Sequence, residues 1–290
     1  MEKIICKERQ EKIKNDPLVT IITVCLNSEK FIKDTIESVL NQTYKNIEYI
    51  IIDGQSKDNT LNIIKEYEPK FEGRMKWITE PDKGIYDAMN KGIEKSNGEI
   101  IGIINSDDWY ENNAVEIAVN TYKKINKEKI IIIGAFNSVR HNKEVIKPFY
   151  CEIDPNDAIS FFSKNINHQA AFVTKMVYKT TGLFNPKYFV VGDRDFFYRA
   201  SQVQQIEFFI FRKILSNARR GGISSEKGLK SIWLFTREKY MLQQGRIKLI
   251  NNIYHCFKFF LIKSTKNILR RILGKNLMRM YYLKKLGYLP

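Results

Sequence analysis

Cysteine is scarce in this chain of 290 residues, and its few cysteines lie far apart. They are Cys6, Cys25, Cys151 and Cys256. There is no Cys-x-x-Cys pair and no spacing typical of a disulfide scaffold. A fold held together by disulfides is therefore not expected, and a reducing compartment is the default setting.

Long apolar runs are also missing. No run approaches the roughly 20 residues that a membrane-spanning helix needs. The segment Met1–Pro17 is highly charged and lacks the apolar core of a signal peptide. Hydrophobic residues still make up 43% of the chain and aromatic residues 12%, which is enough for a substantial core. These features favour a folded cytoplasmic protein.

Glycine-rich phosphate loops are absent. The sequence contains neither Gly-x-Gly-x-x-Gly nor Gly-x-x-x-x-Gly-Lys-Ser/Thr, which cradle phosphates in dinucleotide-binding and P-loop folds. A nucleotide bound by this chain would need another counter-charge for its phosphates. A divalent cation held by carboxylates would supply it.

Acidic residues almost disappear toward the C-terminus. From Arg212 onward there are 19 basic and two acidic residues, whereas the rest of the chain has 29 basic and 30 acidic ones. Apolar residues there recur near helical spacing, with basic residues between them, which predicts a basic helical tail over 224–290. The tail suits an anionic membrane surface, nucleic acid, packing against the rest of the chain, or a solvated face. The scarcity of acids places the membrane first.

The first part of the chain alternates between β-branched apolar stretches and amphipathic stretches. Strands are predicted at Leu18–Val24, Glu48–Ile52, Lys76–Thr79 and Ile100–Ile104, and helices at Glu29–Asn41, Asn59–Tyr67 and Ile85–Lys95. This order indicates βαβ units and a parallel sheet. Further on, the pattern predicts a helix at Asn112–Asn126, strands at Lys129–Phe136 and Val145–Tyr150 (the latter antiparallel), and a short helix at Asp157–Ser163.

Polar residues follow the predicted strand ends. Asn27, Asp53, Asp82 and Asp107 each come directly or shortly after a strand. Ligands of open α/β sheets bind beyond the carboxyl ends of the strands, so these four side chains should gather at one edge. Any single one of them could instead be a turn residue or a helix cap, as is expected of Asn27 or Ser28 before the first helix.

Two adjacent carboxylates, Asp107 and Asp108, end the apolar run Ile100–Ile104 and precede Trp109. Repulsion and desolvation disfavour two neighbouring charges at the end of a buried strand. A divalent cation removes that penalty, because Mg²⁺ and Mn²⁺ prefer oxygen ligands. A solvated turn with a helix cap is the alternative for the pair alone.

Taken in order, these motifs resemble those of the family 2 glycosyltransferases. The resemblance rests on the strand end Thr23–Asn27, the Asp-Gly-x-Ser-x-Asp-x-Thr run at Asp53–Thr60, the loop and helix Asp82–Gly92, and the Asp-Asp pair. It covers roughly Leu18 to Ile223. It implies an α/β fold of the GT-A (nucleotide-diphospho-sugar transferase) type, a Rossmann-like mixed sheet flanked by helices. The expected organisation is a charged leader at 1–17, a glycosyltransferase domain at 18–223 and a tail at 224–290.

The resemblance also implies roles for individual residues. The donor-binding set is Thr23, Val24, Asn27, Asp53, Asp82, Lys83, Ser106 and Asp107. Asp107, helped by Asp108, would hold the Mg²⁺ or Mn²⁺ that bridges the diphosphate. Two departures affect the donor more than the fold: Asn105 replaces an acid of the family's Asp-x-Asp-Asp, and Met89 replaces an arginine that Lys83 could substitute for.

A second chemical signal is the Asp-x-Asp-Phe-x-x-Arg run that starts at Asp193. Asp193 is expected to cap a helix, and the family places its general base at this position. Inversion needs a carboxylate that removes the proton of the acceptor hydroxyl, separate from the one that holds the metal. Asp195 and Arg199, four residues apart, could simply pair with each other.

Three further residues are assigned to the acceptor side by the same resemblance: His168, Gln169 and Trp109. A lone histidine is more often structural than catalytic, so His168 is secondary to Asp193. Arg219 or Arg220, before a Gly-Gly-Ile-Ser turn typical of the family, would meet the diphosphate or lie in a solvated loop.

The resemblance predicts an inverting, metal-dependent hexosyltransferase. It would move a sugar from a nucleotide-sugar, by default a UDP-sugar, to a glycan or lipid-linked acceptor at the inner face of the cell membrane. Two alternatives belong to other classes: a nucleic-acid-binding protein with a basic tail, although no nucleic-acid motif is present, and an inactive homologue acting as a membrane scaffold.

Overall fold

The computed structural model describes residues 16–157, 160–161, 164–221 and 229–243. The chain forms two compact units, residues 1–220 and residues 221–290. Among the described residues, no helix combines the length and apolar character needed to cross a bilayer. In the second unit the structure describes one helix, α9 (Leu229–Gln243), and most of the predicted tail lies outside the described residues.

The first half of the first unit is a parallel sheet of β-branched, apolar strands. Strands β1 (Val19–Cys25) and β2 (Ile47–Asp53) are buried along their whole length. They lie between β3 (Met75–Thr79) and β4 (Ile100–Asn105) in the order β3-β2-β1-β4, with every neighbouring pair parallel. The four strands and the parallel pairing predicted from the sequence are therefore confirmed.

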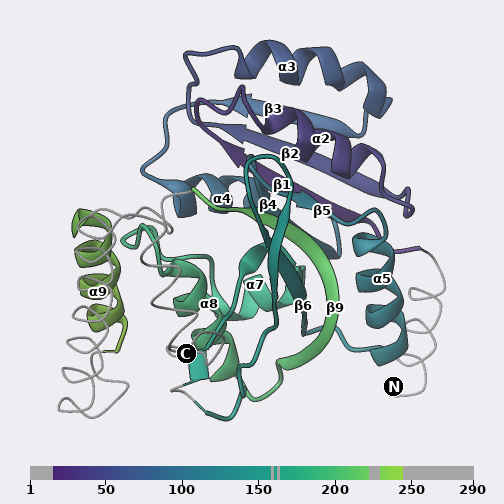
Figure 1. Cartoon of the computed structure of the whole chain (residues 1–290). Helices are drawn as coiled ribbons and strands as arrows, with labels where there is room; N and C mark the ends of the chain where they lie inside the picture. Colours follow the sequence, from purple (N-terminus) through teal and green to yellow (C-terminus); the bar gives the residue numbers. More distant parts are fainter. Residues whose placement is uncertain (1–15, 158–159, 162–163, 222–228, 244–290) are drawn as a thin grey trace, which may run out of the picture. The chain divides into compact units, whose positions relative to one another are not determined.

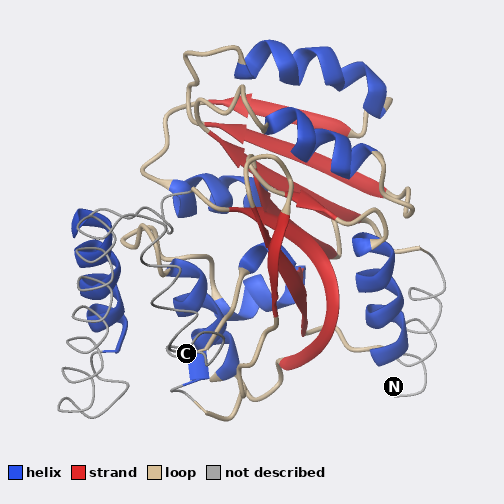
Figure 2. Cartoon of the chain, viewed as in Figure 1, coloured by secondary structure: helices blue, strands red, loops and turns tan. Residues whose placement is uncertain are grey.

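The sheet continues with antiparallel and parallel pairs, so it is mixed. Its further strands are β5 (Trp109–Tyr110), β6 (Ile130–Val139), β7 (Val145–Phe149), β8 (Ala171–Thr174) and β9 (Glu207–Arg219). The order runs β4-β8-β6-β9-β5, with β7 paired antiparallel to β6 as predicted. Figure 2 shows that β9 curves strongly along its length. The described residues thus form one nine-stranded sheet.

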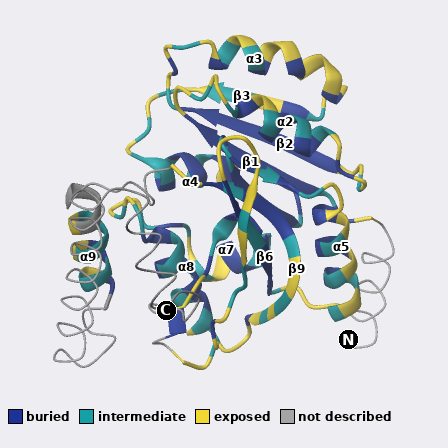
Figure 3. Ribbon diagram, viewed as in Figure 1, coloured by how far each residue is buried: buried dark blue, intermediate teal, exposed yellow. Residues whose placement is uncertain are grey.

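Helices cover both faces of the parallel strands. The described helices of this unit are α2 (Ile32–Leu40), α3 (Thr60–Tyr67), α4 (Ile85–Lys95), α5 (Ala114–Ile125), α7 (Lys175–Thr181) and α8 (Gly192–Ser201), with 3₁₀ turns η1 (Glu68–Phe71) and η2 (His168–Ala170). Of these, α2, α3, α4 and α5 pack on the parallel strands. Apolar residues of α2, α3 and α5 share one core with alternate residues of β1 and β2. Helix α4 contacts the other face of β1, where Gly92 lies against Ile22. Figures 1 and 3 show these helices beside the buried strands, with the outer face of α3 exposed.

Strand register aligns the carboxyl ends of the parallel strands. Cys25 is opposite Asp53, Asp53 is opposite Thr79, and Val24 is opposite Asn105. The loops after β1, β2, β3 and β4 therefore leave the sheet at one edge, where ligands of such folds bind.

Two helix starts differ from the sequence predictions. Neither Asn27 nor Ser28 caps α2, whose N-cap is Phe31 without a side-chain hydrogen bond. The reason is that both residues tie loops together: the Ser28 backbone N–H donates to Thr60 Oγ1 at 2.7 Å, and Asn27 Oδ1 accepts from the Lys57 backbone N–H at 2.8 Å.

Helix α8 also starts earlier than expected. Its N-cap is Val191, so Asp193 lies inside the first turn and does not cap the helix. Strand β9 was not predicted at all, and the helix predicted at Asp157–Ser163 falls partly outside the described residues.

Candidate active site

A histidine joins the end of β4 to the start of α8. His168 lies in η2, with Nε2 3.3 Å from Asn105 Oδ1 and Nδ1 3.5 Å from Asp193 Oδ2. The second carboxylate oxygen of Asp193 accepts a 2.8 Å bond from the Arg194 backbone N–H. Residues far apart in the sequence, 105, 168 and 193, therefore meet in space.

The pair after β4 consists of two very different carboxylates. Asp108 is 3% exposed, with Oδ1 accepting from the Arg219 backbone N–H at 2.6 Å and Oδ2 accepting from the Gln169 side chain. Burial, and then repulsion by Asp107, raise the pKa of Asp108 well above its usual value. Asp108 thus joins β9 and η2 to the turn after β4.

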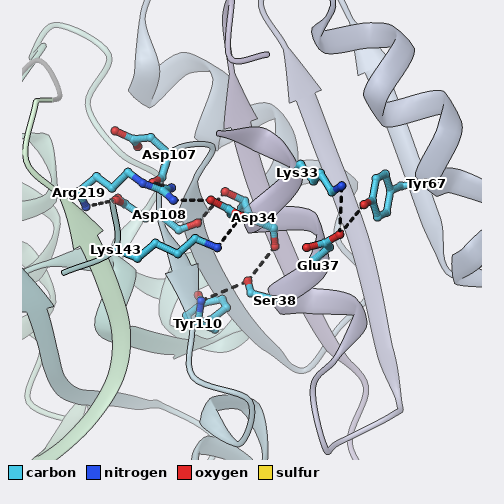
Figure 4. Close-up of polar contacts among 11 residues, drawn as sticks. Lys33, Asp34, Glu37, Ser38, Tyr67, Asp107, Asp108, Tyr110, Lys143 and Arg219 are labelled. Carbon is cyan, nitrogen blue, oxygen red and sulfur yellow. Dashed lines mark hydrogen bonds and ion pairs between the residues drawn. The ribbon is translucent and has the colours of Figure 1, made fainter. Parts of the chain in front are cut away.

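Asp107, in contrast, keeps its carboxylate available. No other described residue donates a hydrogen bond to it, and it points away from Asp34 (Figure 4). Burial raises the pKa of Asp107, and the neighbouring charges of Arg219, His141 and His168 only partly offset that effect. A half-buried carboxylate without a hydrogen-bonding partner residue is a site that a cation would stabilise.

Arg219 lies behind this pair, at the end of β9. Its side chain donates to the Asp107 backbone carbonyl and to Asp34 (Figure 4). The guanidinium lies between two rings, 4.5 Å from the centroid of Phe31 and 4.6 Å from that of Trp109. With 7% exposure, Arg219 is not part of a solvated loop, so that alternative is wrong for this residue.

The β6–β7 hairpin reaches the same group of residues. Lys143, in the turn between the strands, donates to Asp34 at 2.7 Å and lies 5.6 Å from the ring centroid of Trp109. The ring of His141 stacks on Phe31 with centroids 5.5 Å apart. The Asp34 carboxylate therefore pairs with two basic side chains, those of Arg219 at the end of β9 and Lys143 in the β6–β7 turn.

Asp53 is the most enclosed carboxylate of the predicted donor side. It is fully buried, and Oδ2 accepts from the Ser56 backbone N–H at 3.0 Å and from Thr79 Oγ1 at 2.7 Å. Oδ1 accepts from Ser56 Oγ and lies 3.5 Å from Cys25 Sγ. Asp53 thus shapes the loop after β2. Its predicted contact with the nucleotide stays a prediction.

Thr23 and Val24 lie inside the sheet. Thr23 is fully buried and accepts a 3.0 Å hydrogen bond from the Tyr49 hydroxyl, while Val24 is 6% exposed. Asn27, in contrast, is exposed in the loop beyond β1. Its backbone N–H donates to Ser56 Oγ at 2.8 Å and so links the first two loops.

The third and fourth loops approach this edge as well. A Cβ atom added at Gly54 would lie 2.4 Å from Asp82 Oδ2, so the Asp82 carboxylate rests against the loop after β2. Lys83 follows it, with its backbone N–H bonded to Asp87 at 2.9 Å. Ser106 Oγ lies 2.7 Å from Ser28 Oγ, which joins the β4 turn to the β1 loop.

The predicted acceptor residues surround the Asp107–Asp108 turn. Gln169 is 4% exposed and binds Asp108, whereas Trp109 is partly exposed and stacks on Arg219. The structure therefore brings His168, Gln169, Trp109 and Asp193 to the turn that carries Asp107. Their assignment to acceptor binding or catalysis stays a prediction.

The described residues contain no ready-made cluster of three or more His, Cys, Asp or Glu side chains that could hold a metal. Mg²⁺ needs only one or two carboxylates when it also binds substrate phosphates and water. Asp107 fits such a partial site because its carboxylate is available. Asp108 fits less well, since both its oxygens already accept hydrogen bonds.

Comparison with known proteins identifies the family. Residues 20–197 match the sequence profile described as Glycosyl transferase family 2. The chain belongs to glycosyl transferase family 2. This family 2 glycosyltransferase is 29% identical to chondroitin synthase of Escherichia coli over 199 residues, which is 68% of this chain and 29% of that protein. The chain spans about three fifths or less of the length of the first curated relatives it matches.

Solved structures confirm the predicted GT-A fold of the glycosyltransferase. It superposes on residues 1–349 of Staphylococcus aureus TarS in complex with UDP-GlcNAc with a TM-score of 0.61 and 16% identity, covering 93% of this chain and 80% of that one. The mannosyltransferase PcManGT of Pyrobaculum calidifontis, solved with GDP-Man and Mn²⁺, gives a TM-score of 0.61 at 13% identity, covering 99% and 87%.

Sequence reasoning missed the residues behind the Asp107–Asp108 turn. Asp34 and Lys143 carry no motif, and their positions relative to Arg219 follow only from the packing of α2, the β6–β7 hairpin and β9. A signal for β9 was present in its apolar residues Phe208–Phe211. The site that this strand completes was not visible in the sequence.

Proposed function

We propose that this family 2 glycosyltransferase transfers a sugar with inversion from a nucleotide-sugar, by default a UDP-sugar, to a glycan or lipid-linked acceptor. The observation that supports it best is a chain of contacts that leads from one carboxylate to the turn carrying the other. Asp193 is linked through His168 to Asn105, two residues before the available carboxylate of Asp107.

In this mechanism Asp193 is the general base. It takes the proton of the acceptor hydroxyl while that oxygen attacks the anomeric carbon. The bond between this carbon and the phosphate oxygen breaks, and its electron pair leaves with the nucleoside diphosphate. His168 fixes the orientation of the Asp193 carboxylate, and the loops with Asp53, Asp82 and Lys83 bind the donor.

Asp107 would hold the Mg²⁺ or Mn²⁺ that neutralises the diphosphate as it departs. Structures of related fold support this part of the proposal, since PcManGT was solved with Mn²⁺ and GDP-Man. Similarity to chondroitin synthase supports a polysaccharide product. We further propose that the basic tail attaches the enzyme to anionic lipid at the inner face of the membrane.

Purified protein tests the proposal in two steps. Thermal-shift screening of UDP, GDP, dTDP and CMP with Mn²⁺ should identify the nucleotide, and the corresponding nucleotide-sugars should then be hydrolysed or transferred. Asp193→Asn should retain nucleotide binding and lose about 100-fold or more in kcat. Asp107→Asn should lose the effect of Mn²⁺ on nucleotide binding. Full activity in either variant would reject the role given to that residue.

Two other functions make opposite predictions for the same protein. An inactive scaffold would bind none of these nucleotides in the presence of Mn²⁺. A nucleic-acid-binding protein would shift DNA or RNA in a gel at physiological salt, with a steep salt dependence. Nothing in the described fold favours either one.

A further inference from the structure

We propose that Arg219 is a positioning residue for the transfer reaction. It holds the turn after β4 in the conformation that presents the Asp107 carboxylate to the diphosphate of the donor and its cation. The inference rests on the proposed function for the role of Asp107, but the contacts that carry it belong to the chain itself.

Arg219 binds both aspartates of the turn, through different atoms. Its side chain donates to the Asp107 backbone carbonyl, and its backbone N–H donates to Asp108 Oδ1 at 2.6 Å. Within the turn itself, the Asp108 backbone N–H bonds to the Asn105 carbonyl at 3.1 Å. The main chain around Asp107 is therefore fixed on both sides while its carboxylate is left unbound by other residues (Figure 4).

The surroundings of Arg219 require a planar guanidinium. The group lies over two aromatic rings, with its central carbon 4.5 Å from the centroid of Phe31 and 4.6 Å from that of Trp109. From there it donates in two directions, to the Asp107 carbonyl and to the Asp34 carboxylate. A lysine ammonium carries the same charge but lacks the flat, forked set of donors that this position uses.

Asp34 provides the opposite charge that keeps the guanidinium in place. It is also bound by Lys143 from the β6–β7 hairpin at 2.7 Å. The Asp107–Asp108 turn is thus supported by α2, by β9 and by a hairpin, none of which is near it in sequence. Groups that orient a metal ligand commonly affect metal affinity by about 10- to 100-fold.

The neighbouring residue offers a matched control. Arg220 has the same side chain and directly follows the last residue of β9, but its Nε atom donates to Ser138 Oγ at 3.0 Å, on β6. It makes no described contact with Asp107 or Asp108. A substitution at Arg220 therefore reports on loss of an arginine at this strand end without loss of the turn contact.

Hydrogen exchange tests the positioning role without any ligand. We expect the backbone amides of residues 107–109 to exchange at least tenfold faster in Arg219→Lys than in wild type. Arg220→Lys should leave them unchanged, and urea unfolding of both variants identifies any global loss of stability. Equal protection of the turn in wild type and Arg219→Lys would overturn the positioning role.

A second measurement tests the consequence for the cation. Free Mn²⁺ is titrated with protein by electron paramagnetic resonance, in the presence of the nucleoside diphosphate found by thermal shift. Arg219→Lys should weaken Mn²⁺ binding about tenfold or more, with Arg220→Lys equal to wild type. Equal binding by Arg219→Lys overturns the inference. Absence of Mn²⁺ binding in wild type would reject the metal role of Asp107 and hence the proposed function. In that case the hydrogen-exchange measurement still decides whether Arg219 fixes the turn.

Discussion

Asp193 Oδ2 lies 3.5 Å from Nδ1 of His168, a residue that also reaches Asn105 at the end of β4. This relationship connects the first turn of α8 with the carboxyl edge of the parallel strands. The histidine ring therefore lies between the Asp193 carboxylate and Asn105, two residues before Asp107. One side chain thus connects the proposed base with the strand end that leads into the Asp107 turn.

Replacing His168 with alanine should affect turnover more than donor binding. Asp193 would lose the neighbour that orients it, and we expect kcat to fall by about 10- to 100-fold, part of the contribution of a general base. The KM for the donor should change little, since no donor loop is altered. Steady-state kinetics of His168→Ala and His168→Gln measure both constants. A large rise in donor KM with unchanged kcat would contradict the orienting role.

A methyl group at Gly54 should disturb donor binding through Asp82. The added Cβ would lie 2.4 Å from Asp82 Oδ2, so the carboxylate must move. We expect Gly54→Ala to raise the donor KM about fivefold or more, with a smaller effect on kcat. Asp82→Ala should do the same, and the double variant should be no worse than either single one, because both changes remove the same contact.

The matched control for this pair is Glu80→Gln. Glu80 lies in the same loop, but its carboxylate pairs with Lys91 at 3.1 Å and does not approach Gly54. Its donor KM should equal that of wild type. Additive effects of Gly54→Ala and Asp82→Ala would show that the two residues act independently.

Much of the parallel part of the sheet was predictable, because local sequence patterns determine its strands and helices. The β-branched runs of β1, β2 and β4 and the apolar spacing of α4 each identify one element, and the pairing of consecutive βαβ units follows from a general rule. The gathering of loops at one edge follows from the same rule, and the strand register agrees with it.

The second half was less predictable for a physical reason. Strand β9 pairs with β6 and β5, which lie 80 and 108 residues away in sequence at the pairs Asn137–Asn217 and Trp109–Asn217. No local pattern encodes such pairing, and therefore none reveals that Arg219 arrives behind Asp107. The caps predicted at Asn27 and Ser28 failed likewise, because tertiary hydrogen bonds to Lys57 and Thr60 replaced local ones.

Acid should destabilise the fold through Glu48, at the opposite end of the strands. Glu48 accepts hydrogen bonds from Asn97 at 2.7 and 2.8 Å and from Thr20 at 2.7 Å. Burial alone would raise the pKa of Glu48, but these bonds, together with one from Lys76 Nζ at 3.2 Å, outweigh it and hold the pKa below its usual value. A lowered pKa in the folded state stabilises the protein at pH values above the unfolded value of 4.5, and this stabilisation is lost as the pH falls below it.

Glu48→Gln should therefore cost about 1–3 kcal/mol of unfolding free energy at pH 7, because buried donors lose an acceptor. The difference in unfolding free energy between Glu48→Gln and wild type should become smaller as the pH falls below the usual pKa range of glutamate. Urea unfolding between pH 3 and pH 7 (about one measurement per half unit) follows both chains. Glu66→Gln is the control, since its exposed pair with Lys70 spans 3.9 Å and such pairs contribute little. A difference in unfolding free energy that stays constant across the pH range would contradict a lowered pKa of Glu48 in the folded state.

Substitution of Gly92 by alanine should destabilise the protein, although alanine is the better helix former. Helix propensity alone favours Gly92→Ala by about 1 kcal/mol. The added Cβ, however, would lie 2.5 Å from the Cγ2 atom of Ile22 on β1, so α4 must move away from the sheet, and such overpacking costs about 1–3 kcal/mol. Urea unfolding should therefore show a net loss for Gly92→Ala in wild type. In an Ile22→Leu background, which lacks the Cγ2 methyl, the same substitution should become neutral or stabilising. Equal costs in both backgrounds would mean that the close approach of α4 to β1 does not set the requirement for glycine.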